Sequence, residues 1–135
     1  MVKIIKLSNL LLPIGKIPIV RKNTILKETL DKMNKSGLGF ACIVDKNFKL
    51  QGIFTDGDLR RKIINIQKPW AALLSDDTIK YSTNKPLTIK VNSNLNTALN
   101  LMKKKKITDL PVIKNNKLIG ILHLNSIIKF FIKNK

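Results

Sequence analysis

The feature that most constrains the fold of this chain is an internal repeat. Residues 17–64 and 86–131 keep the same order of apolar positions when one stretch is laid over the other. The overlay pairs Leu26 with Leu95, Leu30 with Leu99, Met33 with Met102, Val44 with Ile113, Leu50 with Leu118 and Gly52 with Gly120. Only a turn differs in length, because DKNFK becomes KNNK, and hairpin turns tolerate such a change. The repeat indicates two copies of one small unit.

Each copy opens with an extended piece and a helix. The extended piece, residues 18–20 or 87–91, leads to a polar pair, Asn23-Thr24 or Asn92-Ser93, that we expect to cap the helix. Apolar residues three and four positions apart predict that this helix buries one face. They are Ile25, Leu26, Leu30 and Met33 in the first copy, and Leu95, Ala98, Leu99 and Met102 in the second.

Two apolar runs and a second helix complete each copy. FACIV and LQGIF flank Asp45-Lys46-Asn47, and LPVI and KLIGIL flank Lys114-Asn115-Asn116, a pattern that predicts strand, tight turn and strand. The closing helices are expected to begin near Asp56 and Leu124. The predicted fold class is α/β (α+β). Two pseudo-symmetric strand-helix-strand-strand-helix units are expected to pack sheet to sheet.

The stretches outside the repeat set the predicted domain boundaries. Residues 1–16 form a leading segment, in which VKIIKLSNLLLP is expected to make a short docking helix. The first domain covers 17–67 and the second covers 86–135. Between them, the linker 68–85 starts with a Lys-Pro break, after which WAALLS is a candidate short helix.

The net charge of +18 points first to an anionic partner. The excess is almost entirely lysine spread along the whole chain, and the only arginines are Arg21, Arg60 and Arg61. A dedicated nucleic-acid surface more often clusters its charge and adds arginine and aromatic side chains. We therefore interpret the charge as a solvated lysine-rich surface and keep nucleic-acid binding as an alternative function.

Cysteine usage and hydropathy favour a cytoplasmic protein without a membrane span. Cys42 is the only cysteine and lies inside FACIV, so we expect a buried structural thiol and no internal disulfide. The first sixteen residues lack the pattern of a secretory signal. No apolar run approaches the roughly 20 residues that span a bilayer.

The stretch GIFTDGDLRR, residues 52–61, is where we expect binding chemistry. Gly52 would let the backbone approach a ligand, and Thr55 and Asp58 fall three residues apart at a strand-to-helix junction. A helix start offers N–H groups to phosphate, a threonine hydroxyl can donate to it, and an aspartate can accept from two ribose hydroxyls. The alternative is that the pair forms only a helix cap, and local spacing does not decide between the two.

The repeat, together with GIFTDGDLRR, ITDLPVI and GILH, resembles the CBS domain family over nearly all of residues 17–131. In that family the unit occurs in tandem, and the pair makes a disc-like module with two clefts for adenosyl-type ligands. More narrowly, the motifs look like the C-terminal CBS pair of the arabinose-5-phosphate isomerases, which serve the pathway to the lipopolysaccharide sugar Kdo. The resemblance implies a regulatory module attached to, or partnered with, a sugar-phosphate isomerase domain.

Carried over by motif position, the resemblance also implies a nucleotide site in the first copy. Asp58 would hold the ribose and Thr55 a phosphate. The base would be lined by Ile17, Pro18, Ile19, Gly39, Phe40 and Ala41. The expected regulatory ligand is AMP, ADP, ATP or a CMP-sugar, with no catalytic cofactor.

The second copy departs from this pattern. GILHLNS places His123 where Thr55 stands and Ser126 where Asp58 stands, so the ribose-binding carboxylate is missing. Asp109 would also repel a phosphate. We therefore expect a second cleft that is weak or empty, lined by Thr88, Asp109, Leu110, His123 and Ser126.

No catalytic or metal centre is expected. His123 is the only histidine, a metal site usually needs three or four ligands, and without a carboxylate at matching spacing we expect a cap or cleft-lining role for it. Asp56 and Asp58 diverge at a helix start with no nucleophile beside them. The lysine run 103–106 is predicted to end a helix, where cations oppose the negative dipole end.

Three functions follow as hypotheses. The first is a regulatory module that binds a nucleotide, the second is a fragment of an arabinose-5-phosphate isomerase, and the third is a lysine-rich nucleic-acid-binding protein. In none of them is this chain itself expected to catalyse a reaction. In the second, the catalytic domain would be a separate part of the larger isomerase. Since helix faces of CBS pairs commonly meet, we expect a homodimer.

Overall fold

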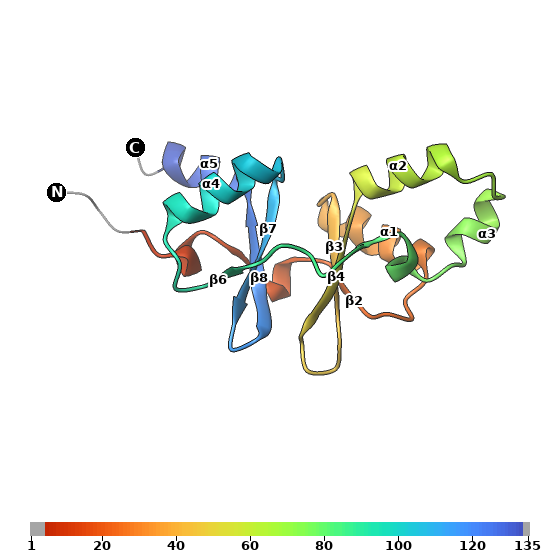
Figure 1. Cartoon of the computed structure of the whole chain (residues 1–135), viewed down its shortest axis with the longest axis horizontal. Helices are drawn as coiled ribbons and strands as arrows, with labels where there is room; N and C mark the ends of the chain where they lie inside the picture. Colours follow the sequence, from red (N-terminus) through yellow and green to blue (C-terminus); the bar gives the residue numbers. More distant parts are fainter. Residues whose placement is uncertain (1–4, 134–135) are drawn as a thin grey trace. The chain divides into compact units, whose positions relative to one another are not determined.

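The computed structural model in Figure 1 describes residues 5–133, which fold as two compact units. The first unit comprises residues 16–86. The second unit combines two separate pieces of chain, residues 1–15 and 87–135. The leading segment therefore belongs to the unit that holds the second copy of the repeat.

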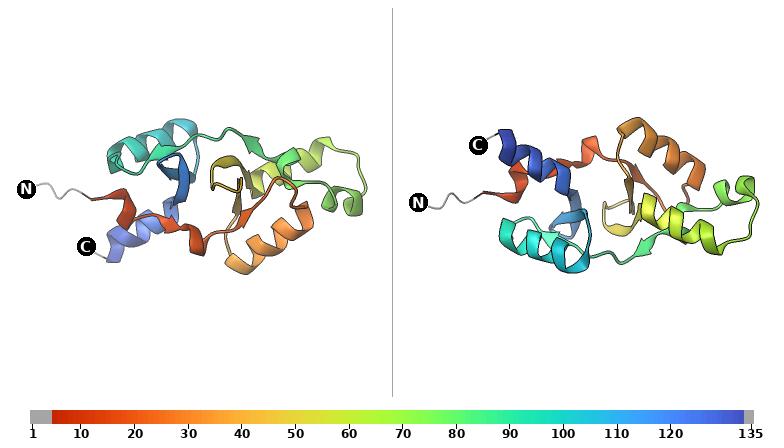
Figure 2. Two further views of the ribbon diagram at one scale, coloured as in Figure 1. Left: turned by 90° about the horizontal axis from the view of Figure 1, so that it is seen from below. Right: turned by 90° about the horizontal axis from the view of Figure 1, so that it is seen from above.

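The first unit is built on a four-stranded sheet with the order β2-β3-β4-β5. The strands are β2 (Ile19–Val20), β3 (Phe40–Val44), β4 (Leu50–Thr55) and β5 (Thr83–Asn84). The helices are α1 (Leu26–Ser36), α2 (Asp56–Asn65), α3 (Trp70–Leu74) and the 3-10 turn η3 (Thr78–Tyr81). Figure 2 shows α1 and α2 on the same face of this sheet, where the core consists of Leu26, Met33, Ala41, Phe54, Leu73 and Tyr81.

The second unit repeats this plan on a sheet with the order β1-β8-β7-β6. Its strands are β1 (Leu12–Pro13), β6 (Ile89–Lys90), β7 (Asp109–Lys114) and β8 (Lys117–His123). Its helices are α4 (Leu95–Lys105), α5 (Leu124–Lys133) and the 3-10 turn η1 (Leu7–Asn9), while η2 (Ile14–Lys16) lies at the boundary of the units. The core holds Leu7, Leu10, Ile89, Ala98, Met102, Leu110, Val112, Leu122 and Ile127.

The predicted fold class is confirmed within each unit. β2 runs parallel to β3 as β6 does to β7, and β3–β4 and β7–β8 are antiparallel hairpins. Even the hydrogen bond that starts the closing helix recurs, since Asp56 N donates to Gly39 O and Leu124 N donates to Thr108 O, both at 2.9 Å. Cys42 is fully buried, as predicted.

The predicted caps of the first helix in each copy are wrong. The N-cap of α1 is Ile25, and no side chain caps it; instead Leu26 N donates to the backbone oxygen of Asp76 at 2.8 Å. In α4 the N-cap is Asn94, whose side chain accepts from Thr97 N at 2.8 Å. Helix α1 thus begins without a capping side chain, because the backbone of Asp76, distant in the sequence, supplies the hydrogen-bond acceptor.

The leading segment is only partly the short helix that the sequence predicts. It makes one 3-10 turn, η1, and then β1, which pairs antiparallel with β8 through Leu12↔Ile121 and Pro13↔Gly120. Proline is tolerated there because an edge strand does not need every N–H. In the linker, WAALLS does form the predicted short helix α3, and β5 then pairs with β4. The domain boundaries themselves stay predictions.

Gly52 and Gly120 make room for these added strands. A Cβ on Gly52 would lie 3.0 Å from Ile79 Cδ1 and 3.1 Å from the Thr83 backbone oxygen, and one on Gly120 would lie 2.6 Å from Leu11 Cδ1 and collide with the Leu12 carbonyl. The close approach expected at Gly52 is therefore that of strand β5 and not of a ligand.

We expect Gly120→Ala to lower the free energy of unfolding by about 1–3 kcal/mol or more, since the β1 backbone must move to admit a methyl group. Gly15→Ala is the matched control, because a Cβ there would have nothing within 4 Å. Urea unfolding of both variants tests this expectation. Equal stability of the two variants would show that β1 does not pack closely on β8.

Asp76 connects the linker to the start of α1 through hydrogen bonds. Its Oδ2 accepts hydrogen bonds from Lys68 Nζ and from the buried Tyr81 hydroxyl, and Lys80 Nζ lies 3.8 Å away. The Lys68 hydrogen bond, followed by that of Tyr81, holds the pKa of Asp76 below its usual range. Nearby, the Thr29 and Thr78 hydroxyls, both fully buried, share a 2.6 Å hydrogen bond.

Because the pKa of Asp76 is lowered on folding, its carboxylate stabilises the fold above the unfolded-state pKa of about 3.9, and this contribution is lost as the pH falls through the lower folded-state pKa. We expect Asp76→Asn to be less stable than wild type at neutral pH and to lose less stability on acidification. Denaturation at a series of pH values measures both effects. Asp77→Asn, which removes the same charge from the adjacent residue, should keep the wild-type profile; if it does not, net charge alone explains the change.

Candidate functional site

Thr55 and Asp58 form a capping box at the start of α2. Asp58 N donates to Thr55 Oγ1 at 3.1 Å, and Asp58 Oδ2 accepts from Thr55 N at 3.0 Å and from Thr55 Oγ1 at 3.1 Å. Asp58 is 6% exposed. The pair therefore does cap the helix, and a nucleotide-binding role for the same two side chains stays a prediction.

The hairpin register brings the start of β3 to this junction. Phe40 lies opposite Thr55 across the β3–β4 pair, and Asp56 N donates to Gly39 O. Antiparallel pairing thus holds the first residues of β3 beside the first turn of α2. Because α2 follows β4 without a loop, its first turn begins at this end of the sheet. The N–H groups of Asp56 and Asp58 already donate to Gly39 O and Thr55 Oγ1, whereas that of Gly57 is not used by the capping box.

The segment of residues 17–19 lies on the other side of β3. Ile19 pairs with Cys42, and Cys42 N donates to Pro18 O at 2.9 Å. Residues 17–19 and 39–41 therefore lie at the starts of the neighbouring strands β2 and β3 of one sheet, and Thr55 ends the next strand, β4, with 56–58 already in α2. Phe40 and Ala41 are fully buried, and Ala41 belongs to the core beneath the helices. Which of these residues touch a ligand stays a prediction.

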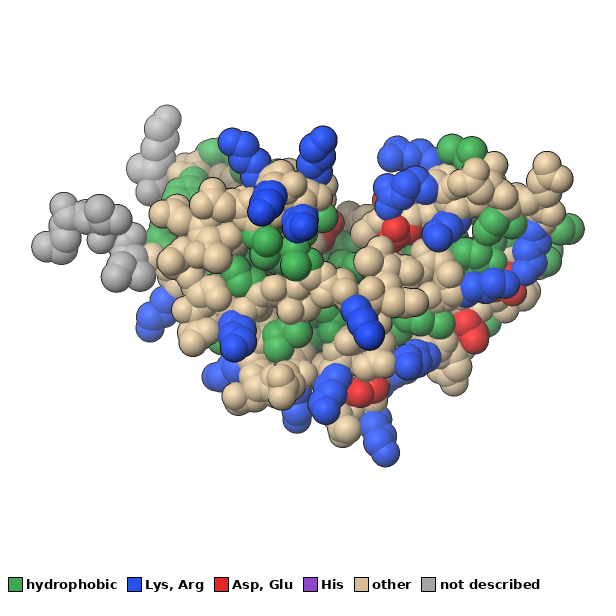
Figure 3. Space-filling view, viewed as in Figure 1, with side chains coloured by type: hydrophobic (Ala, Val, Ile, Leu, Met, Phe, Trp, Pro, Cys, Tyr) green, Lys and Arg blue, Asp and Glu red, His purple; other side chains and the backbone are tan. Residues whose placement is uncertain are grey.

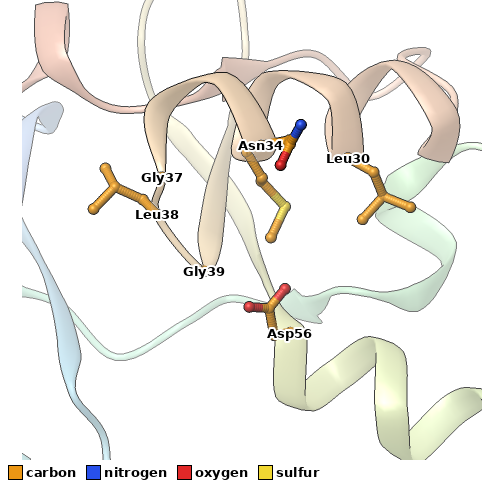
Figure 4. Close-up of a pocket in the computed structure, with 7 residues that line it drawn as sticks. Leu30, Asn34, Gly37, Leu38, Gly39 and Asp56 are labelled. Atoms are coloured by element: carbon orange, nitrogen blue, oxygen red, sulfur yellow. The ribbon is translucent and has the colours of Figure 1, made fainter.

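A pocket of about 340 Å³ opens beside this junction. Figure 4 shows its walls, with the C-terminal half of α1 on one side and the Asp56 side chain facing it from the start of α2. The lining residues are Leu30, Met33, Asn34, Gly37, Leu38, Gly39 and Asp56. Of the predicted site residues the pocket includes Gly39, where a Cβ would lie 2.7 Å from Asp56 Oδ2. The apolar spacing predicted Leu30 and Met33 only as core residues, and no sequence pattern indicated that Asn34 lines a pocket.

The equivalent junction of the second unit holds a histidine–carboxylate pair. His123 Nδ1 is hydrogen-bonded to Asp109 Oδ1, with side-chain exposures of 20% and 13%, and Thr108 Oγ1 donates to Asp109 Oδ2 at 3.2 Å. The expectation that no carboxylate stands at matching spacing to His123 is wrong, since Asp109 lies directly opposite it across β7–β8.

The hairpin turn indicates this partner only in part. Asn115 and Asn116 both have positive φ, 53° and 63°, which is the type I′ geometry that a two-residue loop favours. Counting outward from that turn pairs residue 109 with residue 122, and the bulge between Val112 and Ile113 moves the pairing to residue 123. The sequence alone does not show that bulge.

The other residues predicted for a second cleft lie around this pair. Thr88 immediately precedes β6, Leu110 is fully buried in the core, and Ser126 is half-buried in the first turn of α5. The Asp109 carboxylate, which we expected to repel a phosphate, is hydrogen-bonded to the His123 imidazole. Occupancy of this cleft stays a prediction.

We expect neutral His123 to carry its proton on Nδ1, because a carboxylate can only accept a hydrogen bond from the imidazole. His123 is the only histidine, so a long-range proton–nitrogen NMR correlation reports its tautomer directly. In Asp109→Asn the preference should weaken, since an amide can donate as well as accept. A wild-type spectrum dominated by the Nε2 tautomer would contradict the pairing.

Residues 5–133 contain neither a membrane-spanning helix nor a cluster of metal-binding side chains. No helix in that range is long and apolar enough to cross a membrane. Nor does that part of the chain gather three or more His, Cys, Asp or Glu side chains in a geometry that could hold a metal ion.

The model of the CBS domain matches the chain twice, over residues 10–65 and 77–133. The chain belongs to the CBS domain family. Its two units are therefore a tandem CBS pair, as the resemblance of the motifs predicted. CBS domains are ligand-binding regulatory domains and not catalytic ones, which is the level of function that family membership establishes.

Known proteins resemble this CBS pair over most of its length. RP505 of Rickettsia prowazekii is 37% identical over 124 residues, which cover 91% of this chain and 37% of RP505. The arabinose 5-phosphate isomerase KdsD is 30% identical in Salmonella typhimurium, covering 93% of this chain and 37% of KdsD, and 33% identical in Escherichia coli, covering 84% and 33%. The chain thus spans about a third of the length of these relatives.

Solved structures share the fold of the CBS pair. CBSX2 in complex with AMP superposes with a TM-score of 0.82 at 23% identity, covering 96% of this chain and 97% of CBSX2. The CBS pair of MJ0100, in complex with 5′-methylthioadenosine and S-adenosylmethionine, gives 0.80 at 20% identity, covering 98% and 100%. At these identities the likeness concerns the fold alone.

Proposed function

We infer that this CBS pair is a regulatory module that binds a nucleotide at the start of α2. The ribose hydroxyls donate to Asp58, a phosphate meets Thr55 and the first turn of the helix, and residues 17–19 and 39–41 line the base. The observation that supports this proposal is that these three segments come together near the buried carboxylate of Asp58, in the first turn of α2.

The chemistry of the junction supports a sugar-phosphate ligand. A helix start attracts phosphate, whereas a buried carboxylate accepts from hydroxyls and repels phosphate, so the two features suit different ends of one molecule. CBSX2 and MJ0100, which have the same fold, were solved with AMP and with adenosine derivatives. The proposed ligand is therefore AMP, ADP or ATP, with a CMP-sugar as the alternative, and a thermal-shift screen of these compounds would rank them, because a ligand that binds only the folded state raises its melting temperature.

We expect Asp58→Asn to weaken binding of the best ligand by about tenfold or more, since hydrogen bonds to a charged group are worth about 1.5–3 kcal/mol. Isothermal titration calorimetry measures the loss. Asparagine keeps a side-chain oxygen that can accept from Thr55 N at the N3 position of the capping box, so the variant should stay folded.

Asp56→Asn is the matched control for this experiment. It removes the same charge from the same helical turn, but at an exposed carboxylate that lines the neighbouring pocket. We expect near wild-type affinity from it. Equal losses in the two variants would reduce the role of Asp58 to long-range electrostatics, and wild-type affinity in Asp58→Asn would refute the site.

The partner we propose is a sugar-phosphate isomerase domain of the arabinose-5-phosphate type. The identity to KdsD over about a third of its length supports this partner, and with it a role in the Kdo branch of lipopolysaccharide synthesis and a cytoplasmic location. The exposed apolar side chains of α5, namely Ile128, Phe131 and Ile132, suit a homodimer. Figure 3 shows Lys and Arg side chains dispersed over the visible face of the chain, which gives no support to the alternative of a nucleic-acid-binding surface.

A further inference from the structure

One carboxylate oxygen of Asp58 accepts hydrogen bonds within the capping box, and the other accepts from the exposed side chain of Arg61. Oδ2 accepts both hydrogen bonds from Thr55, and Oδ1 accepts from Arg61 Nη2 at 2.8 Å. A carboxylate oxygen has about two acceptor positions, so Oδ2 is filled. Ribose hydroxyls that bind Asp58 must therefore reach Oδ1, and two of them can do so only when Arg61 withdraws.

Arg61 is placed so that it can withdraw easily. Its side chain is 64% exposed, whereas that of Asp58 is 9% exposed. The guanidinium folds back over the first turn of α2, above Gly57, where a Cβ would lie 3.0 Å from Arg61 Nη1. An ion pair with one partner largely in solvent is weak, so a change of partner costs little.

We propose that Arg61 is the residue that makes this site specific for phosphorylated ligands. Without a ligand it neutralises Asp58; when ribose hydroxyls take Oδ1, the guanidinium moves to the ligand's phosphate at the same helix start. A guanidinium matches phosphate through paired N–H groups. This inference rests on the proposed nucleotide function and adds to it an exchange of partners that a nucleoside, which lacks phosphate, cannot compensate.

The test compares ligand pairs that differ only in phosphate: adenosine with AMP, and cytidine with CMP. Calorimetry at constant ionic strength is run on wild type, Arg61→Met and Arg60→Met. Methionine keeps an apolar stem without the charge, and Arg60 is an exposed arginine on the same helix, so both variants change the net charge equally.

We expect Arg61→Met to weaken the monophosphate about tenfold, as the loss of a charged hydrogen bond predicts, and to leave the nucleoside unchanged or bound up to about threefold more tightly. Arg60→Met should match wild type. Arg61→Lys, which keeps the charge but not the paired N–H groups, should fall between wild type and Arg61→Met.

Three results would overturn the inference. An unchanged ratio of monophosphate to nucleoside affinity in Arg61→Met would remove any role in phosphate recognition. Tighter monophosphate binding by Arg61→Met would make Arg61 only a competitor of the ligand. If wild type binds neither monophosphate, this inference fails; the proposed function fails with it only if ADP, ATP and a CMP-sugar do not bind either, whereas the first two results leave the proposed function standing.

Discussion

The register of the two antiparallel hairpins is the constraint on which the other features of this protein depend. In β3–β4 it sets Phe40 opposite Thr55, and in β7–β8 it sets Asp109 opposite His123. A slip of one residue would turn every side chain of a strand to the other face of the sheet. The turns hold the register, through Phe48 with φ of 62° in the first hairpin and the Asn115-Asn116 pair in the second. The starts of the closing helices, the added edge strands and the His123–Asp109 pair depend on it.

Much of this fold could be predicted from the repeat alone. Apolar runs such as FACIV, buried at every position, and the three-and-four spacing of α1 and α4 are strong local patterns, because burial acts along the whole element. The edge strands β1 and β5 could not be found that way, since two residues have no periodicity. The start of α1 was also out of reach, because its hydrogen-bond acceptor is the backbone of Asp76, fifty residues farther along the chain.

In the candidate site, too, contacts within one segment could be predicted, whereas contacts between strands could not. Thr55 and Asp58 were identified from spacing within one segment, and their contact is local. His123 and Asp109 lie on different strands, so the pair became visible only through register. In the first unit the carboxylate at the junction comes from the helix and its cation, Arg61, from one turn farther along. In the second unit the carboxylate comes from the opposing strand and the imidazole from the position of Thr55. Similar backbones thus place the acidic and the basic side chain of each junction on different elements, and Asp58, which would bind a ligand, also caps the helix.

Strand β1 comes from the chain ahead of the first repeat, yet it borders the sheet of the second. A gene segment encoding only residues 87–133 would leave the outer side of β8 with bare amide and carbonyl groups, and such edges recruit strands from other molecules. Recombination at the repeat boundary would therefore yield an aggregation-prone product. The second copy of the repeat therefore needs a segment that lies ahead of the first copy in the sequence.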